Sequence, residues 1–156
     1  MKHLVLDNPT IKNLDRIVRD YMVDSGVSSV FIVNTAGQML YHRGMAKSDY
    51  MLQSIGALEA GIFNATKGMA KLIHEDYFTS AFQQGRTFSF YYYAITDDII
   101  LISIYGKSSI IGVVQVSSKN AANSILSLMK EKADERLSIG DDFKAEVESM
   151  LDDMFK

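Results

Sequence analysis

The chain has 156 residues, of which 47% are hydrophobic and 22% charged, so it can bury one ordinary core and has little room for a second. Its net charge of -3 lacks the positive field that a phosphate backbone requires, which argues against nucleic acid as a partner. The sequence has no cysteine, which excludes disulfides, thiolate metal sites and thiol nucleophiles.

The apolar runs of the sequence predict a cytoplasmic protein. The N-terminal segment has only three apolar residues in a row before Asp7, too few for the hydrophobic region of a secretory signal. Nowhere does an apolar run approach the roughly 20 residues that span a bilayer. We therefore expect a cytoplasmic location and no direct membrane insertion.

The first elements along the chain are predicted to be a helix and a β-hairpin. Apolar residues recur on one helical face from Ile11 to Met22, and Gly26 is placed to end that helix. Residues 27–34 and 38–43 are rich in β-branched and aromatic side chains on either side of a Thr-Ala-Gly turn. This composition predicts two strands that form a hairpin.

A long central helix is predicted over residues 50–75, and it carries two faces. The apolar face, expected to seat the helix on the core, comprises Ile55, Leu58, Ile62, Ala65, Met69, Leu72 and Ile73. A second stripe of small residues, about a quarter turn away, comprises Ala57, Gly61, Asn64 and Gly68. Because glycine inside a helix costs about 1 kcal/mol against alanine, we expect a close approach at this stripe. This close approach is either to the molecule's own sheet or to another protein. Phe63, which lies on neither stripe, favours the protein interface.

Three β-rich runs at residues 87–96, 99–105 and 110–117 predict a three-stranded meander. The first run is aromatic on both faces. Such a strand is either buried within the sheet or an edge strand that pairs with a second copy of the chain. The candidate residues for dimerisation through this strand are Phe88, Phe90, Tyr91, Tyr92 and Tyr93.

Two helices are predicted at the end of the chain. The first is capped by Ser117 or Ser118 and has one apolar side. The second covers residues 138–156, whose six acidic residues and two lysines give a net charge of -4, so residues 1–137 carry +1. Its apolar stripe comprises Phe143, Val147, Met150, Leu151, Met154 and Phe155. We therefore divide the chain into a domain of residues 1–137 and an acidic amphipathic extension of residues 138–156.

The order helix, two strands, helix, three strands, helix predicts an α/β (α+β) fold. We expect an antiparallel five-stranded sheet with helices packed on its faces and a C-terminal amphipathic helix. The motif Gly106-Lys107-Ser108 resembles the end of a phosphate-binding loop, but Leu101 stands where that loop needs glycine. The three histidines lack partners at metal-ligand spacing, and no serine lies in a nucleophile elbow. We therefore expect no cofactor, no metal and no catalytic residue.

Several runs of the sequence resemble the Roadblock/LC7 family. The similarity covers nearly the whole chain and includes an acidic C-terminus that bears phenylalanine. The matching runs are Val30-Phe31-Ile32-Val33 with Gly37, Gly68-Met69-Ala70-Lys71-Leu72-Ile73, the positions Glu75, Phe78, Phe82 and Gly85, the pair Ile100-Leu101, and Ser109-Ile110-Ile111-Gly112-Val113-Val114.

The resemblance implies a homodimer that binds a Ras-like small GTPase of the MglA type. Such proteins stimulate GTP hydrolysis without an arginine finger and act in cell polarity or motility, so Arg43 and Arg86 are assigned no catalytic role. The dimer is expected to join two sheets edge to edge and to pack two central helices together. The residues to which the resemblance assigns GTPase binding are Ala57, Gly61, Asn64, Ala65 and Gly68.

Two positions depart from the family, because Asn64 is bulkier and Lys67 charged where small residues are usual. The resemblance also implies that the C-terminal helix docks on the GTPase in a helix-in-groove mode. Its anchors would be Phe143, Val147, Leu151 and Phe155. Alternatively, this helix folds back on its own sheet. The alternative function is a dimeric scaffold or adaptor that holds partners without changing any GTPase rate.

Overall fold

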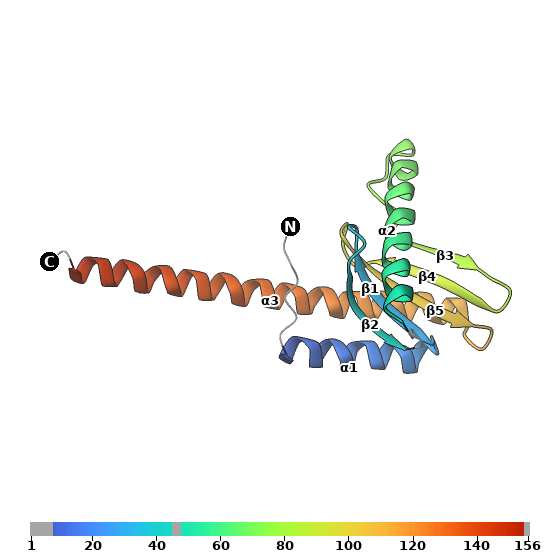
Figure 1. The fold of residues 1–156 in the computed structure, drawn as a ribbon, viewed down its shortest axis with the longest axis horizontal. Helices are drawn as coiled ribbons and strands as arrows, with labels where there is room; N and C mark the ends of the chain where they lie inside the picture. The colour runs from blue at the N-terminus through green and yellow to red at the C-terminus, as the bar shows by residue number, and fades with distance from the viewer. Residues whose placement is uncertain (1–7, 45–47, 155–156) are drawn as a thin grey trace.

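A computed structural model gives the fold and describes residues 8–44 and 48–154. The elements in chain order are α1 (Asn8–Ser25), β1 (Ser29–Asn34), β2 (Met39–Gly44), α2 (Asp49–Leu72), β3 (Ser80–Gln84), β4 (Phe88–Ala94), β5 (Ile99–Gly106) and α3 (Ile111–Met154). Within these residues the strands form one antiparallel five-stranded sheet in the order β2-β1-β5-β4-β3. Helices α1 and α3 cover one face of it, and α2 crosses the other (Figure 1). The α+β fold class is thereby confirmed.

The central strands are buried on both faces of the sheet, which explains why their sequences show no alternation of polar and apolar residues. Along β1, Val30 and Ile32 pack with α1 and α3, whereas Phe31 and Val33 pack with α2. All six residues of β1 are buried. Two apolar clusters, one on each side of the sheet, therefore make up the core.

The prediction of a strand at residues 110–117 is wrong, because α3 already begins at Ile111. Its β-branched residues favour a strand, yet Val114 packs against α1 and the sheet at helical spacing with Ala121 and Ile125. Tertiary burial thus overrides local propensity. The predicted serine cap is also wrong, since the Ser118 hydroxyl lies inside the helix and donates to the Gln115 carbonyl at 2.9 Å.

The missing strand of the meander is β3, which lies outside the runs that the sequence predicts to be strands. Four of its five residues are exposed, so its sequence carries no burial pattern that would mark it as a strand. β3 pairs with β4 from Ser80↔Tyr93 to Gln84↔Ser89. The sheet therefore has the expected number of strands, although one of them lies earlier in the chain than predicted.

Helix α3 has 44 residues and runs without a break through the boundary predicted at residue 138. The C-terminal helix is thus confirmed as helical but is not a separate element. Figure 1 shows its second half projecting from the body as a single helix. At 1.5 Å per residue, the stretch from Glu131 to Met154 is roughly 35 Å long. The division between a domain of residues 1–137 and an extension stays a prediction.

Helix α2 ends in a left-handed residue that is not glycine. His74 has φ 64, and the amides of Ile73, His74 and Glu75 donate to the Ala70 and Lys71 carbonyls. A side chain in this conformation costs roughly 1–2 kcal/mol, partly offset by the lower backbone entropy of the unfolded chain. We expect His74→Gly to raise the free energy of unfolding by about 0.5–1 kcal/mol, measured by urea denaturation. His74→Ala, the control, should give no gain; a loss of stability in His74→Gly would contradict this account.

Candidate functional site

Helix α2 packs on the sheet through a different face from the one predicted. Its buried apolar residues are Ile55, Ala60, Phe63 and Ala70, of which only Ile55 belongs to the predicted apolar face. Phe63 is only 1% exposed, and its ring lies 6.0 Å from the Tyr77 ring and 5.9 Å from the Tyr92 ring, between centroids. The prediction that Phe63 favours an interface is therefore wrong, because this side chain seats the helix on the core.

The predicted apolar face is instead largely open to solvent. Leu58, Met69, Leu72 and Ile73 are 67%, 62%, 83% and 63% exposed, and we call these four residues the outer stripe. They follow one another at helical spacing along one flank of α2. Contiguous exposed apolar side chains mark an interaction surface rather than a core face.

The small-residue face of α2 is also open. Ala57, Gly61, Asn64, Ala65 and Gly68 are all exposed. Taken at 100° per residue, Gly61 and Gly68 lie nearly opposite the buried face, whereas Ala57 and Asn64 border the β1–β2 turn. A Cβ added at Gly61 or Gly68 would meet nothing within 4 Å. Packing onto the molecule's own sheet is therefore not the reason for these two glycines.

The close approach to the sheet occurs instead at Gly56, which belongs to neither of the two predicted stripes. A Cβ on Gly56 would lie 2.6 Å from the carbonyl oxygen of Gly37 in the β1–β2 turn. Gly37 itself has φ 85, a conformation that suits glycine. This pair lets the hairpin turn run directly against the helix, on the flank opposite to the outer stripe.

Asn64 and Lys67, the two departures from the family pattern, bind backbone carbonyls of this molecule. The Asn64 Nδ2 donates to the Thr35 carbonyl at 3.1 Å. The Lys67 Nζ donates to the Asp97 carbonyl at 2.9 Å and lies 5.0 Å from the centre of the Phe63 ring. Their larger side chains therefore have structural partners in two turns of the sheet.

An acidic side chain lies on the buried face of α2. Glu59 is 7% exposed, and burial raises the pKa of its carboxyl group. Burial also raises the pKa of the neighbouring Tyr92 hydroxyl, with a smaller contribution from the Glu59 charge. Low polarity disfavours the charged form of both groups. In the parts of the chain that the structure describes, no cluster of three or more His, Cys, Asp or Glu residues could hold a metal.

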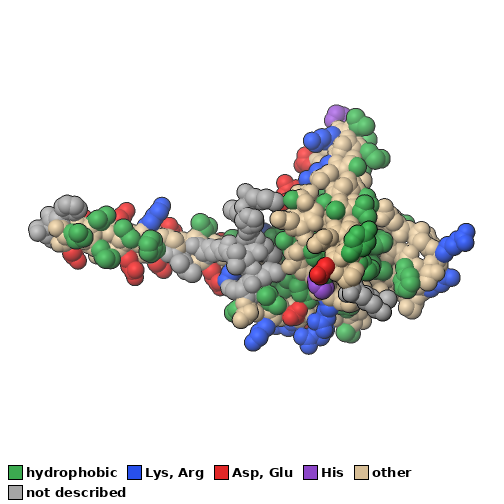
Figure 2. Space-filling model, in the orientation of Figure 1, with side chains coloured by type: hydrophobic (Ala, Val, Ile, Leu, Met, Phe, Trp, Pro, Cys, Tyr) green, Lys and Arg blue, Asp and Glu red, His purple; other side chains and the backbone are tan. Residues whose placement is uncertain are grey.

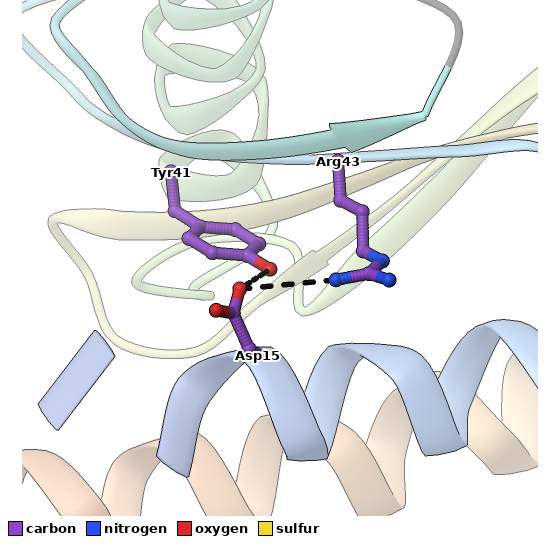
Figure 3. A network of polar contacts seen from close by, with 3 residues as sticks. All are labelled: Asp15, Tyr41 and Arg43. Carbon is purple, nitrogen blue, oxygen red and sulfur yellow. Dashed lines mark hydrogen bonds and ion pairs between the residues drawn. The ribbon is translucent and has the colours of Figure 1, made fainter. Parts of the chain in front are cut away.

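A polar cluster ties β2 to α1 on the other face of the sheet. The Tyr41 hydroxyl donates to Asp15 Oδ1 at 2.6 Å, and Arg43 Nη1 lies 3.9 Å from the same oxygen (Figure 3). Burial, followed by the interaction with Asp15, raises the pKa of Tyr41 to about 12, so its hydroxyl stays protonated and donates. Arg43 thus points toward α1, away from the surfaces of α2.

The aromatic strand β4 is an inner strand, so the prediction that it pairs with a second copy at a sheet edge is wrong. It pairs with β3 on one side and β5 on the other. Of its five candidate residues, Tyr91 and Tyr92 are buried, Phe90 and Tyr93 are half-buried, and Phe88 is exposed. Among the described strands, the free edge on this side belongs to β3, which carries the exposed side chain of Phe82.

The apolar stripe of the C-terminal helix is exposed along the projecting part of α3. Phe143, Val147 and Leu151 are all open to solvent, and Phe155 lies outside the described residues. Figure 2 shows green apolar side chains along this projection with acidic side chains beside them. The alternative in which this helix folds back on its own sheet is not the observed arrangement. No helix among the described residues is long and apolar enough to cross a membrane.

Solved structures with this fold include the gliding protein MglB from Thermus thermophilus. It has a TM-score of 0.76 and 21% identity, and the match covers 84% of this chain and 98% of that chain. Myxococcus xanthus MglB gives a TM-score of 0.70 and 24% identity over 76% of this chain and 95% of that chain. A Roadblock/LC7 domain from Streptomyces avermitilis gives a TM-score of 0.57 and 11% identity, and the match covers 79% of this chain and 97% of that chain. At these identities the likeness shows the fold alone.

The sequence comparisons identify the family. A search of curated proteins gives no match. The Roadblock/LC7 domain pattern, in contrast, matches residues 14–104, which is more than half of the chain and includes the whole of α2 and nearly all of the sheet. The chain therefore belongs to the Roadblock/LC7 family.

Proposed function

We propose that this protein is a homodimeric regulator of a Ras-like small GTPase of the MglA type, which it stimulates to hydrolyse GTP in cell polarity or motility. The observation that carries the proposal is the open, two-sided surface of α2. Gly61 and Gly68 leave space for close approach by a partner, and the outer stripe lies beside them. The family resemblance and the fold shared with MglB support this interpretation.

The second copy of the chain is proposed to cover the outer stripe and the free edge of β3. Leu58, Met69 and Leu72 would pack against the same residues of a second α2, since large exposed apolar side chains gain most from burial. Two β3 edges would pair through their backbones, and Phe82 would be covered there. This arrangement leaves the small-residue face free for the GTPase.

The chain is proposed to contribute shape rather than catalytic groups. No arginine finger is assigned to it, because the family resemblance implies none and gives Arg43 and Arg86 no catalytic role. Arg43 in addition faces α1 through Asp15. Contacts from the small-residue face would hold the GTPase in the conformation in which its own residues stabilise the transition state. The expected acceleration then depends on surface complementarity, and a bulky residue on that face removes it.

Complex formation tests this proposal. The purified chain is mixed with an MglA-type GTPase loaded with GTP or with GDP, and the mass of each species is measured by gel filtration with light scattering. We expect the chain alone to elute as a dimer and to bind the GTP-loaded protein in preference. A monomeric chain that binds neither form would contradict the proposal, and a stable complex with an unchanged hydrolysis rate would favour the scaffold function instead.

The projecting part of α3 is proposed to be a second contact with the GTPase. We expect Phe143→Asp to lower the affinity for the GTPase about tenfold, because the charge would enter an apolar helix-in-groove contact. Calorimetric titration gives the affinity. Ser149→Asp adds the same charge to the other side of the helix and should change little, and removal of the chain after Leu137 should reproduce the loss. Equal affinity for the truncated and full chains would rule out docking by α3.

A further inference from the structure

Two hydrogen bonds hold one flank of α2 to one end of the sheet. Asn64 binds the carbonyl of Thr35 in the β1–β2 turn, and Lys67 binds the carbonyl of Asp97 in the β4–β5 turn. Figure 1 shows both turns beside the middle of α2, with the C-terminal part of the helix extending past them. These bonds therefore lie where the support of the sheet ends.

The two acceptor turns are joined to each other. The Thr35 amide donates to the Asp98 carbonyl at 3.0 Å, and the Thr35 hydroxyl donates to the Asp98 carboxylate. Each turn is also held from within. The Asn34 Oδ1 accepts from the amides of Ala36 and Gln38, and the Thr96 Oγ1 accepts from those of Asp98 and Ile99. The acceptors of Asn64 and Lys67 thus belong to one rigid unit.

Lys67 has a second contact that favours this geometry. Its ammonium group lies 5.0 Å from the centre of the Phe63 ring, which is itself fixed between Tyr77 and Tyr92. The Lys67 ammonium group is therefore held both by the Phe63 ring on the core side and by the Asp97 carbonyl of the β4–β5 turn. At Gly56 the helix and the β1–β2 turn already touch, which gives a pivot near the start of the helix.

We propose that Asn64 and Lys67 form a two-point clamp that sets the angle of α2 against the sheet, and with it the orientation of the small-residue face and the outer stripe. The two residues act as positioning residues. Only the description of these surfaces as partner-binding rests on the proposed function; the clamp itself does not. Because Asn64 also lies on the small-residue face, a partner that binds its amide competes with Thr35 and opens one point of the clamp.

The clamp can be tested on the full chain without any partner. The sequence has no cysteine, so Lys71→Cys on α2 and Asn123→Cys on α3 introduce the only two labelling sites. Both positions are exposed, and electron–electron resonance between spin labels reports the distribution of distances between them. Dilution with unlabelled chain removes distances between protomers.

We expect the variant that combines Asn64→Asp and Lys67→Met to shift and widen this distribution, because neither new side chain can donate to a carbonyl. Gln53→Glu, an exposed amide-to-acid change on the same helix, should leave it narrow. The single variant Lys67→Arg keeps both Asn64 and a donor at position 67, so its distance distribution should be as narrow as that of the parent chain. A distribution in the double variant that coincides with that of the parent chain, with unchanged circular dichroism, would overturn the clamp.

A GTPase assay distinguishes this result from a failure of the proposed function. The assay uses Lys67→Met alone, because Asn64 belongs to the residues proposed to bind the GTPase and Lys67 does not. Should Lys67→Met bind an MglA-type GTPase as the parent does but reach a lower maximal stimulation, the clamp positions α2 for its effect on the partner. The distance distribution could widen in the double variant while the parent chain leaves the GTPase rate unchanged. That pair of results would support the clamp and overturn only the proposed function. If the double variant fails to fold, Lys67→Met alone is measured in the same way, and an unchanged distance distribution would count against the clamp.

Discussion

Phe63→Ala is expected to lower the free energy of unfolding by about 3–5 kcal/mol, the usual cost of removing a buried phenylalanine. The ring is 1% exposed and lies between Tyr77 and Tyr92, where it joins α2 to the cluster on that face of the sheet. Its removal leaves a cavity in the contact that seats α2. Urea denaturation followed by circular dichroism measures the loss.

Leu58→Ala on the same helix is the matched control. Leu58 is 67% exposed, so within the monomer its truncation should change the free energy of unfolding by no more than about 0.5 kcal/mol. If the outer stripe forms the dimer, the effect of Leu58→Ala will grow with protein concentration, whereas that of Phe63→Ala will persist in dilute solution. A larger effect for Leu58 than for Phe63 in the dilute monomer would show that α2 packs by its other face.

Gly68→Arg is expected to abolish partner binding, which means a loss of at least about a hundredfold in affinity, while the fold persists. A Cβ at this position meets nothing within 4 Å, so the side chain projects into solvent in the free chain. Arginine is also a better helix former than glycine, by up to about 1 kcal/mol. The substituted chain should therefore be as stable as the parent but unable to approach the GTPase closely.

Gly112→Arg provides the control for this substitution. Gly112 also lies in a helix with nothing within 4 Å of its added Cβ, but on α3. The same charge and volume there should leave GTPase binding intact. Calorimetric titration compares the two variants, and circular dichroism confirms their folds. If both variants bind as the parent does, the small-residue face is not the contact surface.

The strands that are buried on both faces could be predicted from the sequence because their composition alone is decisive. β1 falls within the predicted residues 27–34, and β5 within residues 99–105 apart from Gly106. The edge strand β2 is not buried but falls within residues 38–43, apart from Gly44, beside the predicted turn. The sequence of residues 110–117 predicts a strand because isoleucine and valine favour strands, whereas the contacts with α1 and the sheet place Ile111 onward in a helix. An exposed edge strand such as β3 has no burial pattern to recognise.

The face of α2 was misassigned for a physical reason that bears on function. The helix buries Glu59 and Gly56 beside Phe63, which gives its core face a mixed composition, while Leu58 and Leu72 are exposed. Apolar periodicity therefore identifies an exposed surface, which we propose binds a partner, instead of the core face. The roles of Asn64 and Lys67 could not be predicted, since their acceptors are 29 and 30 residues away in the sequence.

The most direct test of the central claim is the rate of phosphate release from an MglA-type GTPase loaded with GTP. A saturable increase in that rate on addition of the chain, absent with Gly68→Arg and present with Gly112→Arg, is the predicted result. A rate that stays at the intrinsic value at every concentration of the folded chain would contradict the claim that this protein activates a GTPase.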